Sequence, residues 1–145
     1  AYQKLGFQLL QQDRYAEAIG AFSAVLERDP QHNNTYFNLA ASHEKLQQFE
    51  RARELYLAEL RIDPSDKDVR YRLARLAYSQ RHLDEAMMQI QLALDQDNSA
   101  RHLYFKGRIF EAQQRVDDAV MAYRAAIRLD EGYEKARKAL QRLFG

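Results

Sequence analysis

The chain has 145 residues, of which 46% are hydrophobic and 30% are charged. This hydrophobic content excludes a disordered chain, and the length fits one compact domain or a short repeat array. Lys and Arg number 22 against 21 for Asp and Glu, so the net charge gives no bulk reason to expect nucleic acid or an anionic membrane surface as a partner. The absence of cysteine excludes disulfides and thiolate metal sites.

The start of the sequence carries no targeting signal. No apolar run approaches the roughly 20 residues of a spanning helix, and no signal-peptide pattern opens the chain. The first residue is Ala1, and helical periodicity is already under way by Tyr2 and Leu5. We therefore expect a piece cut from a longer protein, and the compartment stays open between the cytoplasm and a bacterial periplasm.

The predicted helices come in pairs along the chain. Residues 14–30 read RYAEAIGAFSAVLERDP, and closely similar stretches return at 48–64, 82–98 and 115–131. An earlier helical stretch precedes each of them; in the second copy, residues 36–43 place their apolar side chains at the spacing of one helix face. The helix pairs divide the chain into four segments, at about residues 1–30, 34–64, 67–97 and 100–130.

Local signals mark the ends of these helices. Pro30 and Pro64 each follow an aspartate and end a second helix, because proline disfavours helical geometry in the preceding residue and has no N–H to donate. Asn34, Asp68 and Ser99 lie near the starts of the next helices, where short oxygen-bearing side chains can cap free N–H groups.

Small residues repeat at a fixed interval, and they define the columns of a repeat. Four alanines lie 34, 34 and 33 residues apart, namely Ala18, Ala52, Ala86 and Ala119. A second small column holds Gly6, Ala40, Ala74 and Gly107, and a large apolar column holds Phe22, Tyr56, Ile90 and Tyr123. Small residues let two helices approach closely, so we expect these columns to be buried.

The sequence resembles the tetratricopeptide repeat family over essentially the whole chain. The features that carry this resemblance are the repeated columns, the Leu-Gly or Leu-Ala pairs, and the Asp-Pro ends. The resemblance implies an all-α, right-handed superhelical solenoid of four tandem helix-turn-helix repeats, forming a single domain over residues 1–145. A final helix at about 133–144 would cap the stack. Lys106 replaces a leucine, and the fourth copy is one residue short near Asn98, so a change of register is expected between the third and fourth repeats.

The resemblance also implies a concave groove, lined by the first helix of each repeat, that binds an extended peptide. Carried over by column, the candidate binding residues are Phe37, Asn38, Lys45, Tyr71, Arg72, Arg75, Tyr78, Arg101, Tyr104 and Arg108, and the same lining columns hold Glu111. Aromatic rings offer contact area and arginines pair with carboxylates, so the expected guest is acidic or carboxylate-bearing, with apolar side chains. The alternative is that most of this set is ordinary solvated helix surface.

One known binding device of the family is not expected here. Asn38 and Arg72 match two members of the carboxylate clamp with which some family members hold the C-terminal tail of a chaperone. Asp68, however, stands where the clamp needs a lysine, and an acidic side chain there would repel a terminal carboxylate.

The sequence holds no readable enzyme motif. His43-Glu44 begins like a metalloprotease helix, but Gln47 occupies the place of the second ligand. The histidines lack metal-ligand spacing, and we expect His43 to be a packed side chain. We therefore predict a non-catalytic protein-interaction scaffold without cofactor, metal, nucleic acid or membrane insertion. Two alternatives stay open: self-association through exposed apolar residues of the first repeat (Tyr2, Leu5, Leu9), or a docking arm for a catalytic domain outside this piece.

Overall fold

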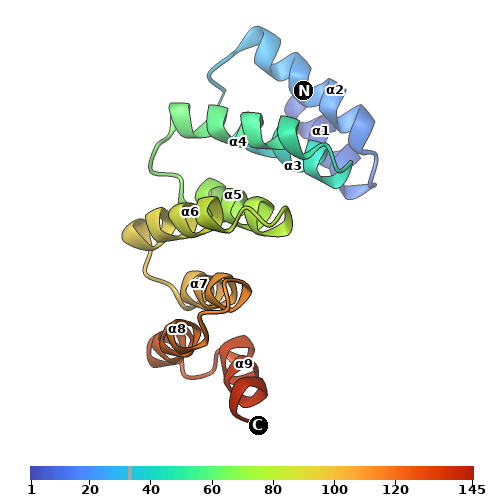
Figure 1. Cartoon of the computed structure of the whole chain (residues 1–145). Coiled ribbons are helices and arrows are strands. Elements are labelled where there is room, and N and C mark those ends of the chain that lie inside the picture. The colour runs from blue at the N-terminus through green and yellow to red at the C-terminus, as the bar shows by residue number, and fades with distance from the viewer. Residues whose placement is uncertain (33) are drawn as a thin grey trace. The chain divides into compact units, whose positions relative to one another are not determined.

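A computed structural model of the chain describes residues 1–32 and 34–145, and all the regular secondary structure in these residues is α-helical. Nine helices occur in this part of the chain (Figure 1): α1 (Tyr2–Gln11), α2 (Tyr15–Arg28), α3 (Thr35–Lys45), α4 (Phe49–Ile62), α5 (Lys67–Ser79), α6 (Leu83–Gln96), α7 (Ala100–Ala112), α8 (Val116–Leu129) and α9 (Glu134–Phe144). They form four antiparallel pairs and a final helix, which confirms the predicted fold class. The chain divides into two compact units, residues 1–69 and 70–145. The superhelical course of the whole array and a single domain over 1–145 stay predictions.

The small column predicted from the sequence lies at the centre of each helix pair. Ala18, Ala52, Ala86 and Ala119 all have an exposed fraction of 0%, as do Phe22, Tyr56, Ile90 and Tyr123. In the first unit α1 packs on α2, α2 on α3, and α3 on α4. The prediction that Leu9 is exposed is wrong, because this side chain is buried.

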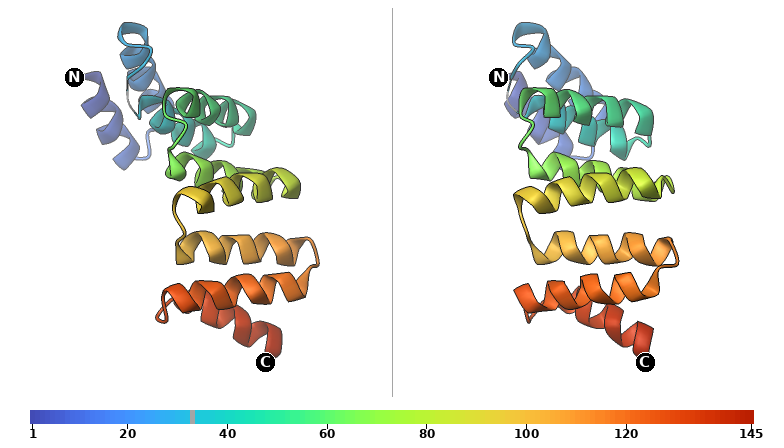
Figure 2. Two further views of the ribbon diagram at one scale, coloured as in Figure 1. Left: turned by 90° about the vertical axis from the view of Figure 1, so that its left-hand side faces the viewer. Right: turned by 60° about the vertical axis from the view of Figure 1, so that its left-hand side comes forward.

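The second unit has two adjoining apolar clusters. Residues of α5 and α6 pack with Phe105 and Ile109 of α7 in one cluster. The other joins α8 to α9, through Tyr123 and Ala126 on one side and Ala136 and Ala139 on the other. Figure 2 shows α7 and α8 running antiparallel side by side, with α9 next to α8. The helix at the end of the chain therefore covers the last repeat, as the amphipathic pattern of residues 133–144 predicts.

Two glycines of the small column permit a close approach between helices. A Cβ added at Gly107 would lie 2.5 Å from Cε1 of Tyr123, and one added at Gly6 would lie 2.6 Å from Cε1 of Phe22. Both rings are fully buried. These glycines therefore let a large ring of the second helix lie directly on the backbone of the first.

The connector inside each helix pair has the same backbone geometry. Its second residue has a positive φ, between 58° and 64°, at Asp13, Gln47, Arg81 and Gln114. After α3, the amide of Gln47 donates to the carbonyl of Glu44 at 2.9 Å and that of Gln48 to the carbonyl of His43 at 2.9 Å. This is the Schellman arrangement, which usually places glycine in the left-handed position. None of the four is glycine, so no residue type signals this geometry in the sequence.

The helix ends agree in part with the prediction. α2 and α4 end two residues before Pro30 and Pro64, and Oγ of Ser99 accepts a hydrogen bond from the amide of His102 at 3.3 Å. The predicted cap at Asp68 is wrong: Asp66 takes this role, and its Oδ1 accepts from the amides of Asp68 and Val69 at 3.0 and 3.2 Å.

Asn34 precedes α3, but its side chain makes no capping bond. Glu59 of α4, which is fully buried, faces this end of α3 instead. Burial raises the pKa of Glu59, and the backbone amides of Asn34 and Phe37 offset part of that rise.

The missing residue of the fourth repeat shortens a connector and leaves the helices in register. Three residues separate α6 from α7, whereas four separate α4 from α5. Gly107 still meets Tyr123 as Gly6 meets Phe22. Lys106 points towards α6, where its Nζ donates to Oε1 of Gln91 at 2.7 Å. The expected change of register therefore does not extend into the helices.

Candidate functional site

Six of the ten predicted binding residues lie together on α5 and α7 of the second unit. The guanidinium carbon of Arg101 is 4.4 Å from the centre of the Tyr71 ring, and that of Arg75 is 5.8 Å from the same ring. Arg108 lies over Tyr78, at 5.1 Å. With the neighbouring Tyr104, these residues form what we call the cationic face, defined as Tyr71, Arg75, Tyr78, Arg101, Tyr104 and Arg108.

The rings of the cationic face are anchored in the core. Tyr71 and Tyr78 both meet Phe105 edge to face, at centroid distances of 5.6 and 5.3 Å, and Phe105 is buried. Tyr104 contacts the rings of Tyr123 and Tyr133 at 5.6 and 5.8 Å. Half-buried rings held in this way have little freedom to lose on binding, which favours recognition.

The cationic face continues into a hollow of about 190 Å³, lined by Tyr78, Tyr104, Arg108, Glu111 and Arg142. Arg142 of α9 donates two hydrogen bonds to the carboxylate of Glu111, at 2.6 and 3.0 Å. The hydroxyl of Tyr123 donates to the same carboxylate. Arg142, and then Tyr123, lower the pKa of Glu111 despite its partial burial. Glu111 therefore stays ionised, and its charge is matched by that of Arg142.

Two arginines of this face, Arg75 and Arg108, lack such a balance. Among residues 1–32 and 34–145, Arg75 and Arg108 make no hydrogen bond or ion pair, although the charge of Arg108 adds to the lowering of the pKa of Glu111. The part of α5 in the second unit (residues 70–79) and the whole of α7 and α9 together carry ten basic and two acidic residues. In contrast, α6 and α8 together carry two basic and five acidic residues. The nearly neutral chain thus sorts its positive charge onto the first helices of its later repeats and onto α9.

The other predicted residues add less to this face. Arg72 is half-buried on α5. Phe37, Asn38 and Lys45 belong to α3 in the first unit, where the ring of Phe37 packs against Tyr56 at 5.8 Å. A groove that joins them to the cationic face stays a prediction.

Arg142 was not among the predicted binding residues, because a capping role was preferred for the basic last helix over a contact with nucleic acid or anionic lipid. Its partner Glu111 lies 31 residues earlier. No local spacing connects the two residues, so only the fold brings them together.

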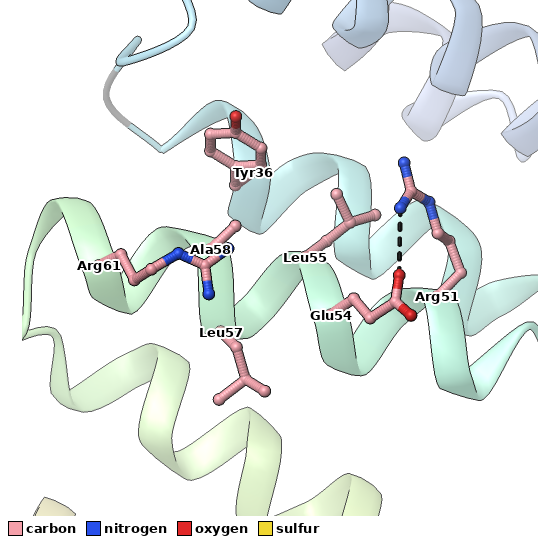
Figure 3. Close-up of a pocket in the computed structure, with 7 residues that line it drawn as sticks. All are labelled: Tyr36, Arg51, Glu54, Leu55, Leu57, Ala58 and Arg61. Atoms are coloured by element: carbon pink, nitrogen blue, oxygen red, sulfur yellow. Dashed lines mark hydrogen bonds and ion pairs between the residues drawn. The ribbon is translucent and has the colours of Figure 1, made fainter.

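A second kind of hollow recurs within the helix pairs. One of about 390 Å³ lies between α3 and α4, and Figure 3 shows the ion pair of Arg51 and Glu54 at its rim, 3.2 Å apart. Another, of about 330 Å³, lies at the equivalent columns of α7 and α8, where Met121 replaces Glu54. Since the same hollow appears in two repeats with different linings, we attribute it to the repeat geometry and assign it no ligand.

The described residues show no inorganic site. Within 1–32 and 34–145, no three His, Asp or Glu side chains gather as a metal site would require. No helix in the same ranges combines the length and the apolar character needed to cross a bilayer. His43 is half-buried, and its Nδ1 lies 2.6 Å from Oε1 of Gln48, so this side chain pairs within its own connector.

Solved structures share this fold. A crystal structure of MamA aligns with a TM-score of 0.82 and 21% identity, over 90% of this chain and 77% of that chain. MamA from Desulfovibrio magneticus RS-1 aligns at 0.83 and 20% identity, over 91% and 75% of the two chains. PilF of Pseudomonas aeruginosa aligns at 0.82 and 22%, over 94% and 63%. At these identities the likeness shows the fold alone.

Sequence comparison gives the family. No curated protein sequence matches this chain significantly. The tetratricopeptide repeat model, in contrast, matches residues 5–67, 45–101 and 71–134. These overlapping matches span nearly all of the four helix pairs, and the chain therefore belongs to the tetratricopeptide repeat family.

Proposed function

We propose that this chain is a non-catalytic interaction domain whose cationic face binds an extended peptide segment that carries carboxylates and apolar side chains. Tetratricopeptide repeat domains are generally protein–protein interaction modules. The observation that carries the finer proposal is Arg108: its guanidinium lies over Tyr78 at the edge of a hollow and makes no hydrogen bond or ion pair with a described residue.

The chemistry of the face favours a carboxylate guest. A guanidinium presents parallel N–H groups that match a carboxylate, and Arg75 and Arg108 have these groups available. The adjacent Tyr71, Tyr78 and Tyr104 offer flat apolar surface with a polar edge, which suits the aliphatic part of a peptide. Charge and contact area therefore support the same class of ligand.

The test uses a short fluorescein-labelled peptide rich in Glu and Leu, and the same peptide with Gln in place of Glu. Fluorescence anisotropy should detect binding of the acidic peptide alone, with an affinity that falls as salt is added. The variant Arg75→Gln/Arg108→Gln should bind at least tenfold more weakly. Arg124→Gln/Arg128→Gln changes the same charge on α8 and serves as the matched control. Equal losses in the two variants, or equal binding of the two peptides, would rule the proposal out.

Self-association is the second candidate, and the exposed side chains of α1 favour it. Tyr2 and Leu5 are each 43% exposed, and Phe7 is 42% exposed. Apolar surface of this kind can be covered by a second copy of the chain. Sedimentation velocity over a wide concentration range would detect a dimer, and Leu5→Ser should weaken it. A monomer at every concentration would exclude this candidate.

A further inference from the structure

We infer that Glu111 determines the charge selectivity of the hollow beside Arg108, so that the hollow accepts one singly charged carboxylate and disfavours a doubly charged phosphoryl group. This inference rests on the proposed function, because it concerns the same face, and it names the anion that the face selects. The carboxylate can belong to an Asp or Glu side chain or to a C-terminus.

The charges around the hollow sum to a single positive charge. Arg108 and Arg142 contribute two positive charges, and Glu111 contributes one negative charge. Glu111 cannot turn away easily, since it accepts hydrogen bonds from Arg142 and from the hydroxyl of the buried Tyr123. The carboxylate of Glu111 is therefore paired with Arg142, and the charge of Arg108 remains for a ligand.

The size of the hollow suits a small anionic group. Its volume of about 190 Å³ corresponds to roughly six water molecules at about 30 Å³ each. A carboxylate and the methylene groups next to it fit this space, with the ring of Tyr78 on one side.

A second negative charge on the ligand meets a fixed negative charge. A phosphoryl group carries close to two charges at neutral pH. One charge is neutralised by Arg108, and the other lies within several ångströms of Glu111, which lines the same hollow. Repulsion at such distances in a partly solvated site corresponds to roughly a tenfold loss of affinity. A single carboxylate avoids this repulsion.

The experiment compares three small probes by NMR titration of the intact chain. N-acetylglutamate N-methylamide presents a side-chain carboxylate, N-acetylalanine presents a C-terminal carboxylate, and N-acetyl-O-phosphoserine N-methylamide presents the dianion. We expect both carboxylates to bind about tenfold more tightly than the phosphoserine derivative. The tighter of the two carboxylates identifies the source that the hollow prefers.

Two variants test the role of Glu111 itself. Glu111→Gln should remove the preference for carboxylate, because the repelling charge is gone. Arg142→Gln retains Glu111 without its partner and should weaken both kinds of anion at least tenfold, which keeps the test decisive if the first variant folds poorly. Glu44→Gln is the matched control: Glu44 accepts from the hydroxyl of Tyr56 at 2.8 Å in the equivalent column of the first unit, and its loss should not change the preference.

The possible results separate the two proposals. Equal affinity for carboxylate and phosphoserine in the wild-type chain, or a preference that survives Glu111→Gln, would overturn the role of Glu111 and leave the acidic-peptide site intact. No binding of any probe, together with no binding of the acidic peptide, would reject the proposed function and this inference with it.

Discussion

Replacing Gly107 by alanine tests the claim that close helix packing determines the small column. The new Cβ would lie 2.5, 2.7 and 2.9 Å from three atoms of the Tyr123 ring. That ring is fully buried and its hydroxyl is bonded to Glu111, so it cannot swing aside freely. Overpacking of this kind costs about 1–3 kcal/mol, whereas Gly→Ala inside a helix gains about 1 kcal/mol in propensity. Ala40 and Tyr56 occupy the same two columns in the second repeat, so a small shift can accommodate the pair. We expect a net loss of up to about 2 kcal/mol.

The assay is urea unfolding followed by circular dichroism, because the chain contains no tryptophan. Gly20→Ala is the control: Gly20 lies inside α2, and an added Cβ there meets nothing within 4 Å, so this change should stabilise the chain. The double variant Gly107→Ala/Tyr123→Ile reproduces the pairing of Ala74 with Ile90 and should lose less than the sum of its single changes. If Gly107→Ala stabilises the chain as much as Gly20→Ala does, the packing explanation is wrong.

Three further predictions concern single side chains. Tyr123→Phe removes the hydroxyl that donates to Glu111 and should lower the free energy of unfolding by about 1–2 kcal/mol, which urea unfolding would measure. An unchanged free energy of unfolding would mean that this hydrogen bond contributes nothing to stability. Burial raises the pKa of Glu59, so the carboxyl group holds a proton more tightly in the native state than in the unfolded chain. Ionisation of Glu59 therefore lowers the stability of the native state as the pH rises above 4.5, the ordinary pKa of this group. Glu59→Gln should therefore stabilise the chain at pH 7, and a gain that persists unchanged below pH 4.5 in urea titrations would contradict this cause. Gln114→Gly relieves a positive φ of 62° and should stabilise the chain by about 0.5–1 kcal/mol. Gln113→Gly, at a φ of −83°, should destabilise the chain. The explanation is wrong if both variants shift the thermal unfolding temperature in the same direction.

The repeated packing residues could be predicted from the sequence because each column must satisfy the same contact in every repeat. Ala52 and Ala86 are buried for this reason, and the Asp-Pro pairs end their helices where expected. The exceptions depend on short-range competition: Asp66 and Asp68 are both suitable caps by type, and only the path of the chain decides that Asp66 is the acceptor.

The charge distribution was partly predictable. The net charge does not reveal it, yet the repeat columns alone place Arg75, Arg101 and Arg108 on the first helices of their repeats. The pairing of Glu111 with Arg142 was not predictable, because it depends on how α9 turns back against α7. The left-handed connectors were also hidden, since glycine, the usual signal, is absent from all four.

The differences between repeats indicate where binding energy can reside. Arg75 and Arg108 share one column, and in the first unit that column holds Phe7 and Ala41. Packing does not explain this difference, because Arg75 and Arg108 are exposed and the buried columns are filled similarly in all four repeats. A carboxylate can therefore find a guanidinium at this position only in the second unit, while the first unit offers an aromatic ring and a small apolar side chain. A peptide bound at the cationic face would place its acidic groups beside Arg75 and Arg108, so moving the Glu residues of the test peptide from one end to the other should change its affinity even though its composition stays the same.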